Sequence, residues 1–517
     1  MSPIRIRAAR RISRKMLAGA VVWIATIVAI ALVFLTFHWP FSQAEVTQDL
    51  EDASSSAVEI KHFRSQYFPH PGCVAESVTF RLGSDKGTPP LITIEKLTVQ
   101  GSFLGLFTKH VTRIRAEGMH VNIPPPGTGE KFHAKRSEIT VDELVADESI
   151  LDFAAREAGK QPTRFAIYKC TFRNVGATGP MSYQVALTNP KPPGEISATG
   201  QFGPWRENNA GQTPVSGNYL FQNADLGVFR GISGMLSSKG KFQGVLDHIE
   251  IQGATNVPEF KVTSSSHKVQ LETQFHAFVN ATNGDTFLQP AYAHFWRTTV
   301  VSAGSIAGIS GQKGKTTALD LAAKDGRIQD VLRLFVKTER APMTGVTSFK
   351  LKALIPPEKR PFLRKVELQG DFGIDAGNFT RTDTQENVNR FSQGARGEDD
   401  DTDPESVLSD LKGHVVLKDG TATFSNLSFS VPGAFAQFHG TYSIITEKID
   451  LHGILRTDAK LSKTAHGVKA LLLKVLDPFF KKKPAGSLVP VKITGTYQNP
   501  SFGLDLAGKN RPRASGK

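Results

Sequence analysis

The sequence predicts a mainly β protein, with one N-terminal transmembrane helix followed by an elongated antiparallel β-sheet that carries a few short helices. Three observations lead to this fold class. Apolar and polar residues alternate over much of the chain after residue 90, long stretches with helical periodicity are few, and one uncharged apolar run lies near the N-terminus. At 517 residues the chain is also far longer than one ordinary hydrophobic core requires.

The uncharged apolar run covers residues 16–37, which is 22 residues. At about 1.5 Å per residue a helix of this length extends roughly 33 Å, enough to cross a bilayer core. Residues 1–15 carry six Lys and Arg and no acid, which predicts a cytoplasmic N-terminus, and Trp39 and Phe41 follow at the far interface. We interpret the run as an uncleaved signal-anchor. The alternative is a cleaved signal peptide ending near Ala44, but 22 apolar residues exceed the usual length.

Strands are predicted where the apolar period is two. The clearest alternations lie in residues 269–279, 427–431, 449–455 and 489–497. Alternation of this kind is typical of antiparallel sheets with one wet face and one apolar face. Asp419-Gly420 between two such runs predicts a hairpin turn.

A short repeat supports an extended sheet. Glycine followed two residues later by an aromatic residue recurs near predicted strand ends, at Gly200-Phe202, Gly240-Phe242, Gly370-Phe372, Gly440-Tyr442 and Gly495-Tyr497. Repetition of a hairpin-like unit favours a sheet that grows by accretion, and ordinary turn glycines are the alternative explanation.

Helices are predicted at few places. Residues 327–336 place Ile328, Val331, Leu332 and Phe335 on one helical face. Residues 141–158 have helical composition, and residues 467–480 are the most apolar late segment. Residues 375–408 are polar and contain four consecutive acids at 398–401, which predicts a helix-containing insertion with a solvated acidic loop.

The net charge of +14 is concentrated at the two ends of the chain. Six positive charges come from residues 1–15 and a net ten from residues 460–517, so that residues 16–459 together carry −2. Nucleic-acid binding requires cations clustered on a folded face, which a near-neutral body does not provide. Basic ends beside apolar segments suit anionic lipid head groups instead.

Motifs that carry catalytic or metal chemistry are missing from the sequence. Residues 311–316 (GQKGKT) resemble a phosphate loop, but position 309 is Ile where glycine is required, and residues 316–322 alternate as a strand. The acidic run lacks calcium-loop spacing, and the 14 histidines form no zinc motif. Cys73 and Cys170 are the only cysteines, and a bond between them stays open at this point. We therefore expect a protein without enzymatic activity, cofactor or metal.

Several segments resemble the AsmA-like family of bacterial envelope proteins. The resemblance is carried by residues 92–123, 189–205 and 213–246, and most specifically by residues 411–506 with LKGHVVLKDGTATFSNLSFSVPGAFAQFHG, LLLKVLDPFF and VPVKITGTYQNPSFGLDL. It extends over nearly the whole chain and is weakest between 375 and 408. The family has no catalytic motif, so the resemblance assigns no functional residue.

The resemblance implies an inner-membrane anchor followed by a curved, taco-like sheet with an open apolar groove. Family members are similar to bridge-like lipid-transfer proteins and are linked to outer-membrane biogenesis. Together with the charge and apolar pattern, the resemblance predicts six segments. They are a cytoplasmic segment (1–15), an anchor (16–38), a periplasmic β domain (39–374), a polar insertion (375–410), a C-terminal β region (411–506) and a basic tail (507–517).

The leading hypothesis is therefore a single-pass protein of the bacterial inner membrane, with most of its chain in the periplasm, that binds or transfers phospholipid through an apolar β groove. The expected partners are phospholipids, the inner membrane and envelope or outer-membrane proteins. The candidate membrane or partner contacts are Leu471, Leu472, Leu473, Phe479, Phe480, Lys481, Lys482 and Lys483. The alternative is a structural or regulatory factor in outer-membrane protein assembly that acts through protein contacts.

Overall fold

The computed structural model describes a defined part of the chain, to which the statements below refer. The described residues are 40–81, 90–105, 108, 110–123, 139–153, 162–176, 179–206, 209–229, 231–309, 314–396, 405–458, 488–496 and 499–505. The predicted anchor, residues 16–38, lies outside them. Within these ranges, none of the helices has both the length and the apolarity that a membrane crossing requires.

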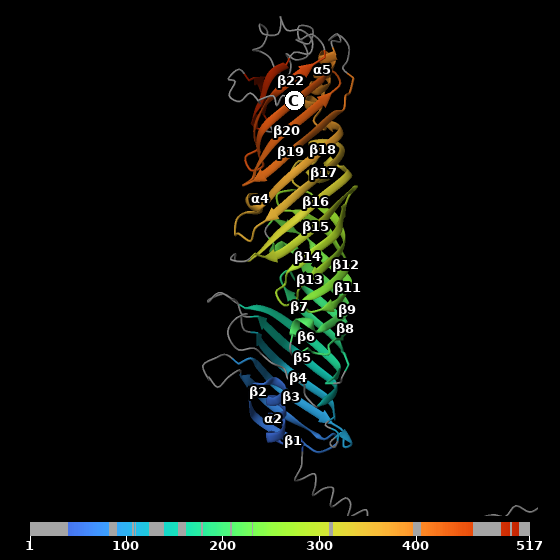
Figure 1. The fold of residues 1–517 in the computed structure, drawn as a ribbon, viewed down its shortest axis with the longest axis vertical. Coiled ribbons are helices and arrows are strands. Elements are labelled where there is room, and N and C mark those ends of the chain that lie inside the picture. Colours follow the sequence, from blue (N-terminus) through green and yellow to red (C-terminus); the bar gives the residue numbers. More distant parts are fainter. Residues whose placement is uncertain are drawn as a thin grey trace, which may run out of the picture. The chain divides into compact units, whose positions relative to one another are not determined.

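The structure is mainly β, and its strands form a long open sheet accompanied by few helices, as predicted (Figure 1). The chain divides into two compact units, residues 1–182 and 183–517. The sequence did not indicate this boundary, which falls inside strand β7 (Met181–Pro190). The elements of the first unit are α2 (Gln43–Ser54), β1 (Ala57–Gln66), β2 (Gly72–Arg81), β3 (Ile92–Gly101), β4 (His110–Ile123), β5 (Thr140–Phe153) and β6 (Thr163–Val175).

In the first unit β1 to β4 are antiparallel neighbours, but β4 and β5 are parallel. The prediction of an antiparallel sheet is therefore wrong at this one pair. A parallel pair requires a crossover of about a dozen or more residues, and 16 residues separate Ile123 from Thr140. Residues 141–153, which have helical composition, form most of β5 because their apolar side chains pack on the neighbouring strands.

Helix α2 covers the apolar face at the β1 end of this unit. The Ser42 hydroxyl accepts a hydrogen bond from the Glu45 amide at 3.3 Å and caps the helix. Phe41 and Val46 are buried in one cluster with Ile60 and the apolar residues of β2 and β3. The opposite face carries ion pairs, including Arg115–Asp147 at 2.8 Å.

The two cysteines do not pair. Cys73 on β2 and Cys170 on β6 are both free and buried. Three strands, β3, β4 and β5, lie between them in the sheet, roughly 19 Å at about 4.8 Å per strand step. Burial raises the pKa of the Cys73 thiol to about 12 and that of Cys170 to about 11, so both are protonated and unreactive at neutral pH.

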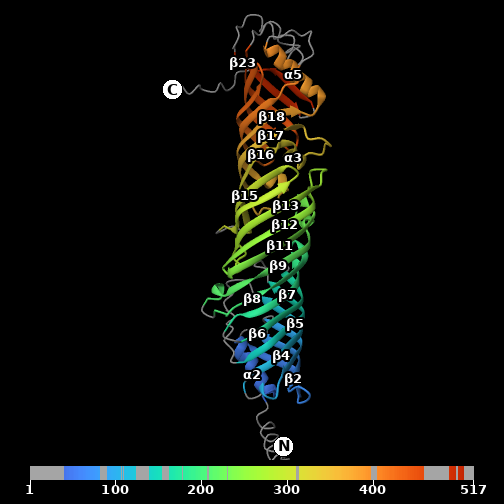
Figure 2. The same ribbon diagram turned by 90° about the vertical axis from the view of Figure 1, so that its right-hand side faces the viewer.

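The second unit is one series of antiparallel strands joined in chain order (Figure 2). Its strands are β8 (Pro193–Phe202), β9 (Pro214–Asp225), β10 (Ile232–Ser233), β11 (Met235–Val245), β12 (His248–Val262), β13 (Val269–Val279), β14 (Thr286–Phe295), β15 (Thr298–Gly308), β16 (Lys315–Arg327), β17 (Met343–Ile355), β18 (Glu367–Phe379), β19 (Ser409–Lys418), β20 (Thr421–Val431), β21 (Ala434–Ser443), β22 (Lys448–Thr457), β23 (Leu488–Thr496) and β24 (Pro500–Leu504). Its helical elements are η2 (Ala210–Gln212), η3 (Leu226–Val228), α3 (Ile328–Arg333), α4 (Phe362–Lys365) and α5 (Thr382–Arg396).

Several local predictions are confirmed in this unit. The Asp419-Gly420 turn joins β19 to β20 with positive φ at both residues, as a two-residue hairpin requires. Residues 316–322 lie in strand β16 rather than at a helix start. The predicted helix at 327–336 is α3, although Phe335 lies beyond its end and is half exposed instead of sharing the apolar face.

The predicted polar insertion also contains its helix, α5, and strand β18 continues into it as far as Phe379. The helix is more buried than its polar composition indicates. Val388, Phe391 and Ala395 pack on apolar residues of β20 to β23. The acidic residues 398–401 lie outside the described residues.

Candidate functional site: the apolar face of the second unit

The candidate site is one face of the sheet in the second unit, which we call the apolar face. It is defined by a row of directly opposite residues, one from each of the sixteen strands from β8 to β24 that form the series, without β10. The row is Gly200, Gly217, Phe242, Ile251, Ala277, Leu288, Gly304, Leu319, Ala353, Leu368, Leu417, Ala422, Tyr442, Ile449, Gly495 and Pro500. Tyr442 contributes the only polar side-chain atom in this row.

The register holds this face together in spite of β-bulges. A slip of one residue would exchange the apolar and polar faces of a strand. Bulges lie between neighbouring residue pairs in several ladders, for example between Gln274 and His276 on β13. The row nevertheless continues with Ala277 opposite Leu288 on β14. The sequence of each strand is therefore in phase with its neighbours over the whole unit.

Most of the apolar face is partly exposed. Phe275 on β13, Leu321 on β16 and Leu351 on β17 each keep intermediate exposure, whereas residues of a sandwich core would be buried. Within the described residues, the strands of this unit form a single series, and none of them lies over the face as a second layer. An exposed apolar face of this size is typical of a binding site, because covering it with another apolar group lowers the free energy.

Aromatic side chains of this face lie over glycines of neighbouring strands. A Cβ atom on Gly253 would lie 2.6 Å from the Tyr219 hydroxyl oxygen and 3.0 Å from the Phe275 ring. A Cβ on Gly217 would lie 2.7 Å from the Tyr183 hydroxyl and 3.1 Å from the Phe242 ring. Glycine at these two positions leaves room for a ring on the neighbouring strand. Of the five glycines in the glycine–aromatic repeat, only Gly240 has a ring among the three atoms nearest to an ideal Cβ, that of Tyr219 at 2.8 Å, and backbone atoms are nearest at the other four.

Burial on this face also changes the acidity of two tyrosines. It raises the pKa of Tyr183 to about 12 and also raises the pKa of Tyr219. The Tyr219 hydroxyl lies 3.1 Å from the Ser238 hydroxyl, and the Tyr183 hydroxyl donates to the Ser216 carbonyl at 3.3 Å. Both phenols therefore stay neutral at physiological pH, and their hydroxyl groups are hydrogen-bonded.

Helix α5 covers the apolar face at β20 to β23. Ala436 and Leu455 are fully buried beneath it, in one cluster with Phe391. The helix is held by polar contacts as well, because Gln385 donates to the Val407 carbonyl at 2.9 Å and Ser392 donates to the Pro432 carbonyl at 2.6 Å. The apolar face is therefore closed here. It is also partly covered at β17 to β19, where Ile328 of α3 packs with Met343 and Ile374, and where Phe362 of α4 packs with the row residues Leu368 and Leu417. From β8 to β16 the row residues other than Ala277 keep intermediate exposure.

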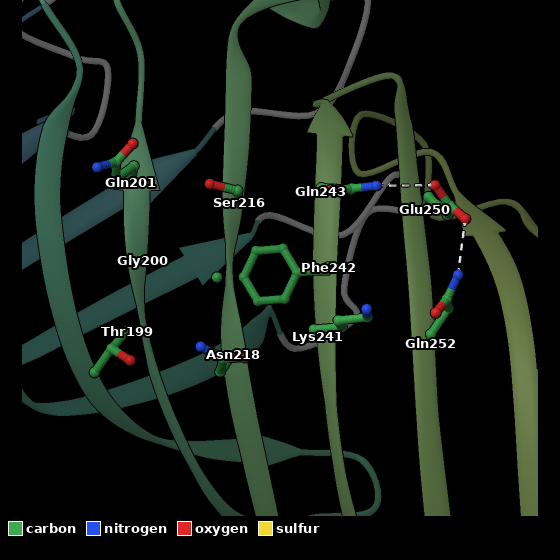
Figure 3. Close-up of a pocket in the computed structure, with 11 residues that line it drawn as sticks. Thr199, Gly200, Gln201, Ser216, Asn218, Lys241, Phe242, Gln243, Glu250 and Gln252 are labelled. Carbon is green, nitrogen blue, oxygen red and sulfur yellow. Dashed lines mark hydrogen bonds between the residues drawn. The ribbon is translucent and has the colours of Figure 1, made fainter.

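A polar depression of about 400 Å³ lies across β8, β9, β11 and β12 (Figure 3). Polar side chains from these strands line it, among them Asn218, Lys241 and Glu250. Gln243 and Gln252 donate hydrogen bonds to Glu250 and, together with His276, lower the pKa of this carboxyl. Glu250 is therefore an ionised, fully hydrogen-bonded acceptor, which is a poor general acid at neutral pH.

Metal ligation has little support in the described part of the chain, where no group of three or more His, Cys, Asp or Glu side chains could hold an ion. His248 and His276 lie on the polar faces of β12 and β13, where His276 contacts Glu250 at 2.9 Å and His248 stacks on Phe278. The eight predicted contact residues, Leu471, Leu472, Leu473, Phe479, Phe480, Lys481, Lys482 and Lys483, lie outside the described residues.

Comparison of the chain with protein-family models, with curated proteins and with solved structures finds no match. The resemblance to the AsmA-like family stays a prediction from the sequence. The function must therefore be argued from the apolar face itself. Sequence alternation indicated the face, but not its continuity, its exposure or its cover by α5.

Proposed function

We propose that this protein is anchored in the inner membrane of a bacterial envelope, binds phospholipid acyl chains on the apolar face, and takes part in lipid transfer during outer-membrane biogenesis. The observation that carries the proposal is the apolar row through sixteen strands, most of which stays partly exposed. Apolar surface removed from water contributes about 25 cal/mol per Å². Burial of acyl chains on this face is therefore favourable wherever α3, α4 and α5 leave it open.

The size of the face favours several lipids over a single one. Fifteen strand-to-strand steps at about 4.8 Å give roughly 70 Å measured across the strands. One leaflet of a bilayer core is only about 15 Å thick, half of the usual 30 Å. An apolar face of this length exceeds the extent of one acyl chain several times over, which suits a track along which lipids move.

Site-specific photocrosslinking tests the proposal. A benzophenone amino acid replaces Phe275 or Leu351 in the full chain, which is purified from membranes in mild detergent after irradiation. Both residues lie on the partly exposed apolar face. We expect phospholipid adducts at both positions by mass spectrometry, because acyl chains would lie within reach of the probe.

The controls are the preceding residues Gln274 and Lys350, which are exposed on the opposite face of the same strands. The proposal requires that these positions give few or no lipid adducts. Equal labelling of both faces would indicate detergent or bulk lipid. Loss of adducts at Phe275 and Leu351 in a folded protein would contradict lipid binding.

A further inference from the structure

Four exposed apolar side chains gather at one end of the first unit. Phe68 is 82% exposed and Tyr67 61% in the connection between β1 and β2, while Leu104 is 85% exposed and Phe103 50% in the turn after β3. The strand register brings the two connections together, because Gly72 at the start of β2 lies opposite Gln100 near the end of β3. The Gly101 amide also donates to the Pro71 carbonyl at 2.7 Å.

Hydrogen bonds order the backbone of the turn after β3. The Ser102 hydroxyl accepts a hydrogen bond from the Gly105 amide at 3.0 Å, and the Gly105 carbonyl accepts one from the Thr108 amide at 3.0 Å. Phe103 and Leu104 lie inside this turn, and neither belongs to the buried apolar cluster of the first unit. Exposure of two large apolar side chains to water is unfavourable, and covering them with another apolar surface would lower the free energy.

The chain leaves the predicted anchor at this same end. Phe41 is buried, and its carbonyl accepts a hydrogen bond from the Ser65 hydroxyl at 3.1 Å. A Cβ on Gly101 would lie 2.9 Å from the Phe41 ring, which places this ring against the end of β3. Only three residue steps separate Phe41 from the end of the predicted anchor at residue 38, about 10 Å of extended chain.

The charge of these connections also suits a lipid surface. In the sequence, residues 61–75 and 99–112 contain neither Asp nor Glu, and they contain three cationic residues, Lys61, Arg64 and Lys109. Anionic head groups attract such cations, and aromatic residues are enriched at membrane interfaces.

We infer that Tyr67, Phe68, Phe103 and Leu104 form a membrane-docking surface that inserts into the interface of the bilayer holding the anchor. The surface would fix the first unit against the bilayer, whereas a single helix followed by a short connection would leave it free to tilt. The inference rests on the predicted anchor in the proposed function, but it does not require lipid on the apolar face.

The test uses the full chain in nanodiscs of phosphatidylethanolamine and phosphatidylglycerol. Phe68→Cys and Leu104→Cys each receive an environment-sensitive NBD fluorophore, and the native Cys73 and Cys170 are buried and stay unlabelled. We expect blue-shifted emission and quenching by doxyl-labelled lipid at both positions. A matched control is Tyr168→Cys on β6, an aromatic position that is 59% exposed and seven residues from the β6 end nearest these turns.

Quenching at least about twofold stronger at Phe68→Cys and Leu104→Cys than at Tyr168→Cys would support docking, since only interfacial side chains reach the acyl region. Water-like emission at both turns, in a chain that still floats with the nanodiscs, would overturn it. Lipid crosslinking at Phe275 is a separate readout. Docking without adducts at Phe275 would reject the proposed function alone, and adducts without docking would reject this inference alone.

Discussion

At the scale of the residue, Gly253 shows how the apolar face accommodates its rings. The space that a side chain would occupy is taken by Tyr219 and Phe275, and the Lys239 carbonyl lies 2.8 Å from an ideal Cβ. A backbone atom cannot move away as a flexible side chain can. The glycine is therefore required by packing, although glycine inside a strand normally lowers stability.

We predict that Gly253→Ala destabilises β11 to β13 by about 1–3 kcal/mol, because the added methyl overpacks the cross-strand contact. Hydrogen exchange of peptides from these strands, measured as a function of urea, gives the change. The matched control is Gly373→Ala on β18, where the nearest atom would lie 3.6 Å away. Equal loss of stability in both variants would show that overpacking at Gly253 is not the cause.

Asp152 on β5 is the residue whose ionisation contributes most clearly to the first unit. Its side chain is only 5% exposed and accepts hydrogen bonds from Arg164 at 2.7 and 2.9 Å, with the His120 ring at 2.8 Å. Chiefly because of Arg164, the pKa of Asp152 falls from 3.8 to about 2. The folded-state pKa is lower than the unfolded one, so the carboxylate stabilises the fold above about pH 4 and loses this effect between about pH 4 and pH 2.

We predict that Asp152→Asn lowers the stability of β5 and β6 by about 2 kcal/mol at pH 7, and that the difference from the natural chain disappears near pH 2. Urea-dependent hydrogen exchange at a series of pH values measures it. Asp142→Asn is the control, since Asp142 is 54% exposed in its contact with His110 and should change stability little. A deficit for Asp152→Asn that is independent of pH would contradict the electrostatic explanation.

At the scale of the element, α5 combines a polar sequence with a buried position. Gln385, Asn389 and Gln393 are nearly inaccessible, and the Asn389 side chain accepts from both Gln385 and the Val407 amide. These hydrogen bonds give the buried amides polar partners, and Phe391 is the largest of the helix side chains in the buried apolar cluster. The helix therefore depends on specific tertiary contacts rather than on a broad apolar stripe.

We predict that Phe391→Ala weakens the packing of α5 by about 3 kcal/mol, the usual cost of removing a buried phenylalanine side chain. Hydrogen exchange should rise in α5 and in the strands beneath it, β21 and β22. Arg390→Ala is the matched control, because the neighbouring Arg390 is exposed and lies outside the buried cluster. Unchanged exchange in Phe391→Ala would mean that the polar contacts alone hold the helix.

At the scale of the whole molecule, the two units carry different parts of the proposed activity. The first unit has a closed core beneath α2 and the exposed apolar turns beside the predicted anchor. The second has the long apolar face, which is partly exposed from β8 to β16, partly covered by α3 and α4 at β17 to β19, and covered by α5 at β20 to β23. The strands of the second unit contact mainly their sequence neighbours, so its apolar face can extend without a larger core.

The sequence by itself determined the mainly β class, the hairpin at Asp419-Gly420 and the short helix at α3, because each depends on local alternation or turn chemistry. It also indicated the apolar faces of individual strands. Only the tertiary structure decided that these faces join into one row, that α5 covers its end, and that Cys73 and Cys170 stay apart. The same holds for Phe68 and Leu104, whose connections lie at the same end of the first unit. Register, cover and proximity come from pairing between distant residues, which a local period of two does not encode.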